Sequence, residues 1–119
     1  MNRESLIQFC RQLPHATEDV KWDSNHVFSI GGKMFAVFDL NNGVSVSFKA
    51  TPATFDLLTT KIGVIPAPYL ARANWIAVIK PKALPLAVIK QLLRESYHLV
   101  AAKLPMNVKK ELRLTGSSR

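Results

Sequence analysis

Basic residues at helical spacing are the part of the sequence whose chemistry is easiest to infer. Lys90, Arg94 and His98 recur every four residues, which places them on one side of a helix. Such a ridge of cations suits a phosphate backbone and would position it without reading its sequence. The basic residues that extend the ridge toward the C-terminus are Lys103, Lys109, Lys110 and Arg113. The alternative is an ordinary solvated helix face, partly balanced by Glu95.

A second candidate surface lies in the segment 63–80, which combines two prolines with aromatic and basic residues. Tyr69 and Trp75 could stack on bases, as aromatic residues do in proteins that bind single strands. Arg72, Lys80 and Lys82 would then hold phosphates. The alternative is scaffolding, since the prolines stiffen the segment and the aromatic rings can pin it across a sheet edge. The scaffolding interpretation accounts for every residue of the segment.

Two further lysines fall near the ends of predicted hairpin strands. Lys33 follows the Gly31-Gly32 pair, and Lys49 closes the third run of strand-forming residues. In a nucleic-acid-binding protein these positions would make wing contacts with phosphates. The alternative is that they are strand-edge lysines, which discourage aggregation.

The charge of the chain is uneven. Its formal net charge is +8, and residues 80–119 carry nine Lys and Arg against two Asp and Glu, a net +7. A basic end of this kind attracts polyanions, which favours nucleic acid or an acidic partner. The alternative is that the charge serves solubility alone.

Residues for metal or acid-base chemistry are scattered. His15, His26 and His98 fall in different predicted elements, and no His-x-x-x-His pair is present. Asp23 near His26, and the adjacent pair Glu18-Asp19, lie in polar connections where solvated turns are the default. We therefore expect neither a metal site nor a cofactor.

Nucleophilic and phosphate-loop motifs are also missing. Ser96 lies within a predicted helix and lacks the context of a nucleophile elbow, so it is interpreted as a small packing residue. The Gly31-Gly32 turn before Lys33 does not match the P-loop pattern. We expect a binding protein rather than an enzyme.

Length and composition indicate one domain over residues 1–119, with 113–119 as a frayed end. The 119 residues are 48% hydrophobic and 20% charged, which is typical of a folded globular protein. The start is interrupted by charges where a signal peptide would be apolar, so we expect a cytoplasmic protein that does not enter a membrane. Cys10 is the single cysteine, which excludes an intrachain disulfide, and it is predicted to be a small buried residue. No segment demands a dimer, so a monomer is expected.

Periodicity predicts the elements. Residues 3–13 repeat apolar side chains at helical steps, and so do residues 85–104 over five turns. Thr51 and Pro52 suit the cap and the first position of a third helix, and residues 107–114 suggest a short last one. Three runs separated by Gly31-Gly32 and Asn41-Asn42-Gly43 should pair as antiparallel strands. The middle run is expected to alternate, with Ala36 and Phe38 on one side and Phe35 and Val37 on the other.

The segment 74–79 has the character of a further strand, while the residues before it form an extended strap. The predicted order is therefore α-β-β-β-α-β-α. This order indicates an α+β domain, an antiparallel sheet with helices packed on it.

Four stretches together are similar to a known family. They are IGGKMFAVF, KATPATFDLL, GVIPAPYLARANWIAV and ESYHLVAAKLP, in this order and spacing. They resemble the YjbR/MmcQ family of small bacterial proteins, and the likeness runs from the LPHATED segment to Pro105. His15 stands where many members have glycine, a departure that concerns a turn.

The resemblance implies a double-wing DNA-binding-like fold, also likened to the frataxin type. It therefore implies a DNA-binding module with low sequence specificity, and it supplies no catalytic residues. The alternative class is a non-enzymatic adaptor for a protein or small ligand, which would use the strap at residues 66–69 and a groove on the sheet. Replacing Lys90 and Arg94 with glutamate is expected to abolish DNA binding if the module interpretation holds.

Overall fold

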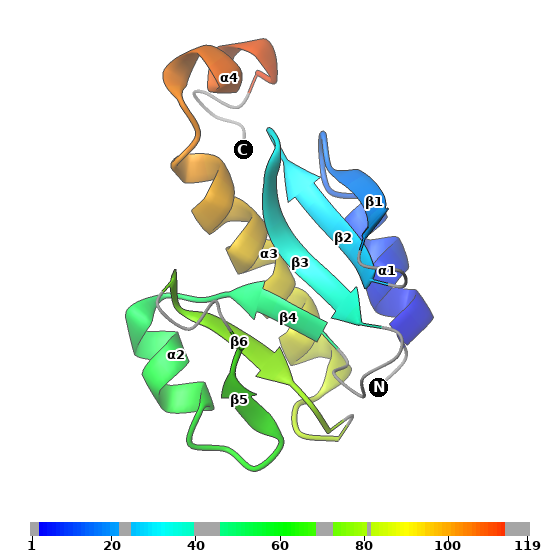
Figure 1. Ribbon diagram of the computed structural model, residues 1–119, viewed down its shortest axis with the longest axis vertical. Coiled ribbons are helices and arrows are strands. Elements are labelled where there is room, and N and C mark those ends of the chain that lie inside the picture. The colour runs from blue at the N-terminus through cyan, green and yellow to red at the C-terminus, as the bar shows by residue number, and fades with distance from the viewer. Residues whose placement is uncertain (1–2, 22–24, 40–45, 69–72, 81, 114–119) are drawn as a thin grey trace.

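An antiparallel sheet with helices packed on it confirms the predicted α+β class (Figure 1). The structure is a computed structural model, and it describes residues 3–21, 25–39, 46–68, 73–80 and 82–113. In chain order the elements are α1 (Arg3–Arg11), β1 (Thr17–Lys21), β2 (Asn25–Ile30), β3 (Lys33–Asp39), β4 (Val46–Lys49), α2 (Pro52–Leu58), β5 (Val64–Pro66), β6 (Trp75–Val78), α3 (Leu86–Ala102) and α4 (Met106–Glu111).

The six strands lie in the order β1-β2-β3-β4-β6-β5, and each pair of neighbours is antiparallel. Two edge strands were missing from the predicted order. Every residue of β1 is exposed, so this strand lacks the alternation that identifies a half-buried strand. β5 has only three residues and ends at Pro66, which is tolerated at a sheet edge because proline has no N–H to donate.

A two-residue turn joins β2 to β3, as predicted. Gly31 and Gly32 have φ of +59° and +83°, the left-handed conformations that such a hairpin turn requires. A Cβ on Gly31 would lie 2.7 Å from Leu104 Cδ1, so glycine also lets the chain that follows α3 come close to this turn. The predicted turn at Asn41-Asn42-Gly43 lies outside the described residues.

The alternation predicted for β3 is wrong at one point. The register with β2 shifts after Phe28, which leaves Phe35 as an extra residue in β3. This bulge turns Phe35 toward the same side as Ala36 and Phe38, while Val37 faces the other side. A single inserted residue is not visible in a two-residue period.

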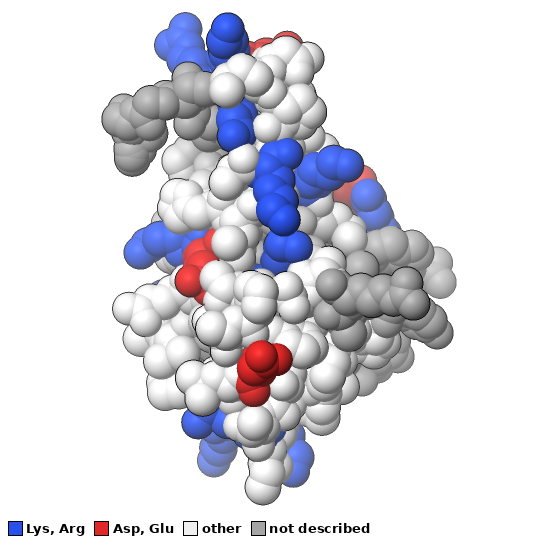
Figure 2. Space-filling model, turned by 90° about the vertical axis from the view of Figure 1, so that its left-hand side faces the viewer, with Lys and Arg blue, Asp and Glu red and all other residues white. Residues whose placement is uncertain are grey.

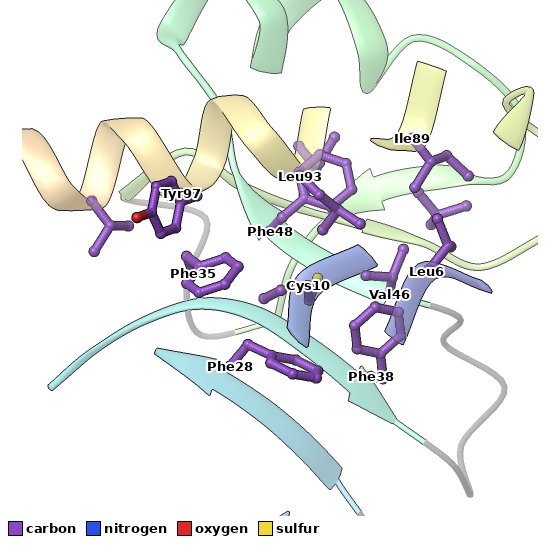
Figure 3. Packing of buried hydrophobic residues seen from close by; sticks show 14 of the residues in the cluster. Leu6, Cys10, Phe28, Phe35, Phe38, Val46, Phe48, Ile89, Leu93 and Tyr97 are labelled. Carbon is purple, nitrogen blue, oxygen red and sulfur yellow. The ribbon is translucent and has the colours of Figure 1, made fainter. Parts of the chain in front are cut away.

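The main core lies between the sheet and helices α1 and α3, which cover one face (Figure 1). Figure 3 shows Phe35, Phe28 and Phe38 on the strands facing Tyr97 and Leu93 of α3. Cys10 of α1 is fully buried among them, as predicted. The opposite face carries a smaller cluster of Val27, Val37, Ala67, Trp75 and Ala77.

The predicted helix starts are present. Thr51 Oγ1 accepts a hydrogen bond of 3.1 Å from the Thr54 backbone N–H, and Pro52 is the first residue of α2. α3 begins after Pro85, and α4 follows Pro105. Within the described ranges, no helix has both the length and the apolar character needed to span a membrane.

Candidate anion-binding cleft

A buried hydroxyl separates strands β3 and β4 in the middle of the sheet. The two strands pair at Ala36 with Phe48 and at Val37 with Ser47, and the next pair in this register would be Phe35 with Lys49. Instead, the Ser96 hydroxyl lies between those two backbones. It accepts a hydrogen bond of 2.9 Å from the Lys49 N–H and donates one of 2.6 Å to the Phe35 carbonyl. Ser96 therefore relays the ladder hydrogen bond and keeps the strands apart.

Ser96 was predicted to be a small packing residue, and in the structure its hydroxyl also makes two hydrogen bonds. Its side chain is fully buried, and both hydrogen bonds go to backbone groups. A buried hydroxyl with satisfied donor and acceptor fixes the position of its neighbours. Ser96 joins the middle of α3 to two strands at the point where they diverge.

Beyond Ser96, the gap between the diverging strands opens into a cleft of about 260 Å³. Its walls come from the start of β3, the end of β4, the start of β6 and the C-terminal half of α3. The lining residues are Lys33, Met34, Lys49, Trp75, Leu99, Val100 and Lys103. Figure 2 shows the corresponding side of the molecule, with Lys and Arg side chains gathered across its middle and upper part.

The polar lining of the cleft is cationic. Three of the lining residues are lysines, and among the described residues that line the cleft none is acidic. The Lys49 ammonium donates a hydrogen bond of 2.9 Å to the Ala73 carbonyl, which holds it just before the start of β6. Burial, and secondly the positive charge of Lys103, lower the pKa of Lys49. Positive charges held together in a partly dry recess favour an anionic ligand.

Trp75 forms an apolar wall of the cleft. It pairs with Lys49 across β4 and β6, and its exposed fraction is 5%. This burial agrees with the scaffolding interpretation, because a base could reach only the edge of the ring. Tyr69 and Arg72, the other members of the predicted stacking surface, lie outside the described residues.

The predicted ridge on α3 lies away from the cleft. Arg94 and His98 are exposed and Lys90 is half-buried, and the Arg94 guanidinium lies 5.3 Å from the centre of the Phe9 ring of α1. Nine residues separate Arg94 from Lys103, which is about two and a half helical turns, so the two side chains leave α3 on opposite sides. One basic surface predicted from the sequence is therefore two surfaces in the fold.

The remaining predicted basic residues divide in the same way. Lys80 and Lys82 follow the end of β6, at the opposite end of this strand from Trp75. Lys109 and Lys110 are on α4, which comes just after Lys103. The Val108 side chain of this helix would lie 3.1 Å from a Cβ on Gly31, so α4 packs near the turn that precedes Lys33. The α4 helix therefore lies close to the end of β3 that lines the cleft.

A separate polar cluster joins α1 to the edge of the sheet. Arg11 donates hydrogen bonds of 2.6 and 2.9 Å to the two carboxylate oxygens of Glu18 on β1. His26 Nδ1 on β2 lies 2.8 Å from Glu18 Oε2. The hydrogen bonds from Arg11, and then from His26, lower the pKa of Glu18 against the effect of burial. This group was not predicted, because Glu18 was expected in a polar loop and not in a strand paired with β2.

Groups of three or more metal-ligating side chains are not found in the part of the chain that the structure describes.

Sequence spacing alone pointed to Lys33 and Lys49 individually and to Lys103 as part of the ridge. Their meeting depends on the wedge at Ser96 and on the close approach at Gly31.

Comparisons with known proteins agree with this fold. The family model described as YjbR matches residues 11–99. A search of curated proteins finds no match. A crystal structure of a Deinococcus radiodurans protein with the domain DUF419 is similar, with a TM-score of 0.79 and 27% identity, over 98% of this chain and 94% of that one. A Pseudomonas syringae protein has a TM-score of 0.69 and 24% identity, over 84% of this chain and 99% of that one, and shows the fold alone.

Proposed function

This chain belongs to the YjbR family, and we propose that it is a nucleic-acid-binding module that contacts phosphates with little sequence specificity. The observation that carries the proposal is the meeting of Lys33, Lys49 and Lys103 from three elements at one cleft. Like charges brought together by folding repel one another, and a bound polyanion removes that repulsion. The sequence motifs resemble the YjbR/MmcQ family, and this resemblance, which implies a DNA-binding module, supports the proposal.

The proposed contact surface is the cleft together with the lysines of α4. Lys109 and Lys110 lie on α4, which follows Lys103 in the chain, and they add positive charge without making the contact more sequence-specific. Lys90, Arg94 and His98 lie on the other side of α3, so they would not meet the same stretch of a rigid duplex. In this proposal the protein acts as a cytoplasmic monomer, without catalysis and without a metal or cofactor.

Fluorescence anisotropy of labelled duplex and single-stranded DNA, repeated across a salt series, tests the proposal. Phosphate binding releases counterions, so the logarithm of affinity should fall linearly with the logarithm of salt concentration. An affinity that does not respond to salt would favour an adaptor that buries apolar surface. Absence of binding at low salt would refute the module.

Two matched double variants locate the contact surface. Lys33→Gln with Lys103→Gln removes two charges from the cleft, and Lys90→Gln with Arg94→Gln removes two from the ridge. The measured quantity is the slope of log affinity against log salt concentration for duplex DNA. Loss of two phosphate contacts should reduce the magnitude of this slope by roughly 1.8 in the cleft variant, and the ridge variant should leave the slope unchanged. If instead the ridge variant changed the slope and the cleft variant did not, with both melting temperatures preserved, the contact surface would be the ridge that the sequence predicts.

A further inference from the structure

The shape of the cleft selects among phosphate ligands. It is an open hollow beside Ser96, lined by residues of β3, β4 and β6 and of the C-terminal end of α3, and a group that projects fills it better than a flat surface does. Phosphates along an intact duplex can meet Lys33 and Lys103, which are exposed, but they are linked on both sides and lie on a convex surface, so they do not fill the space between these lysines. A phosphate at the end of a strand, or on a free nucleotide, is linked on one side only and can project.

The charge of the cleft also favours a terminal phosphate. A phosphodiester carries one negative charge, whereas a phosphomonoester carries about −1.5 to −2 near neutral pH and offers three acceptor oxygens. Three lining lysines, with no carboxylate among the described lining residues, match the second group better. Lys49 is held in place by the Ala73 carbonyl, so its position is set before a ligand arrives.

The apolar lining gives the rest of the ligand a surface. Met34, Trp75 and Leu99 line the cleft beside the lysines. Small-molecule sites typically combine apolar walls with a few charged groups that fix orientation. A sugar or base attached to the phosphate would cover these apolar side chains, whereas inorganic phosphate would leave them exposed to water.

We propose that this cleft binds a phosphomonoester attached to a nucleoside, with the phosphate among Lys33, Lys49 and Lys103 and the nucleoside against the wall that contains Trp75. Two sources share this chemistry: a free mononucleotide and the phosphorylated end of a nucleic-acid strand. The inference names a ligand for the site of the proposed function. Binding of a strand end requires that the protein bind nucleic acid, as proposed above, whereas binding of a free mononucleotide does not.

Tryptophan fluorescence provides a direct measurement. The chain has two tryptophans, and Trp22→Phe leaves Trp75 as the single reporter within the cleft wall. Adenosine monophosphate should change the emission of Trp75 and bind at least about tenfold more tightly than adenosine or inorganic phosphate. Equal affinity for the monophosphate and inorganic phosphate would refute the role of the nucleoside wall. No response to the monophosphate, with no heat of binding by calorimetry, would overturn the proposal.

Point variants in the same background assign the site. Lys103→Gln removes an exposed ammonium group from the cleft and should weaken monophosphate binding about tenfold. Lys82→Gln removes an exposed charge outside the cleft and is the matched control, with no expected change. If both variants weakened binding equally, the effect would be that of net charge and the assignment to the cleft would be wrong.

Short oligonucleotides with phosphate or hydroxyl at their ends distinguish the two sources. Tighter binding of the phosphorylated strand, displaced by adenosine monophosphate, identifies a strand end. Monophosphate binding with no effect of the end group identifies a free nucleotide, and if no oligonucleotide binds at all, the proposed function fails while this inference stands. Salt-dependent DNA binding that ignores both the end group and the monophosphate would overturn this inference and leave the proposed function intact.

Discussion

Replacing Ser96 with alanine tests whether the wedge between β3 and β4 supports the cleft. The hydroxyl satisfies two backbone groups, the Lys49 N–H at 2.9 Å and the Phe35 carbonyl at 2.6 Å. Each buried group left without a partner costs about 1–3 kcal/mol. For two groups, Ser96→Ala should therefore lower the free energy of unfolding by about 2–6 kcal/mol, a large share of the stability of a domain of this size.

Urea denaturation followed by circular dichroism measures this loss, and a constant m-value confirms that only stability has changed. Thr60→Ala is the matched control, because its hydroxyl donates a hydrogen bond of 2.7 Å to the Leu57 carbonyl at an exposed site where water can replace it. The control should change stability by less than about 0.5 kcal/mol. A loss for Ser96→Ala as small as that of the control would refute the wedge. It would mean that the strands close up and pair directly.

Three other predictions follow from burial and backbone geometry. Trp75→Ala should cost about 3–5 kcal/mol in urea denaturation, because the side chain is 5% exposed; an unchanged midpoint would mean that the ring is not part of the core. Gly31→Ala should destabilise the domain more than Gly32→Ala, since both residues have positive φ but only Gly31 would bring a Cβ within 2.7 Å of Leu104; equal melting temperatures would contradict the close approach. Burial raises the pKa of the Cys10 thiol to about 12 from 9.0, with a smaller contribution from Glu18, so a thiol reagent should label it only in the unfolded chain. Between those two pH values the unfolded chain releases this proton and the folded one keeps it, so the contribution of Cys10 should lower the free energy of unfolding as pH rises; rapid labelling of the native protein would contradict its burial.

Much of the fold could be predicted from local patterns. The helical steps of α1 and α3, the cap at Thr51 and the Gly31-Gly32 turn each depend on a few neighbouring residues, and each is present in the structure. β1 could not be predicted in this way, because its residues are all exposed and its only evidence is its pairing with β2. The bulge at Phe35 was missed because it depends on the partner strand and on the helix above it.

The candidate site shows the same limit more strongly. The charge of the last third of the chain drew attention to the basic residues of α3, yet Lys33 and Lys49 of the cleft come from the first half. Helical periodicity correctly placed Lys90, Arg94 and His98 on one side of α3. It could not show that this side faces away from the cleft, because that depends on how α3 is rotated against the sheet.

The sequence by itself determined the α+β class, the main helices and hairpins, and the family, because these properties depend on composition, on periodicity and on motifs along the chain. Only the tertiary structure decided which charges meet. A repeat pattern places a residue on a face of its own element, but the order of the strands, the inserted hydroxyl of Ser96 and the contact of Leu104 with the Gly31 turn bring faces of different elements together. The cleft is a product of those long-range contacts, in which Lys103 of the last long helix lies beside lysines of the early strands.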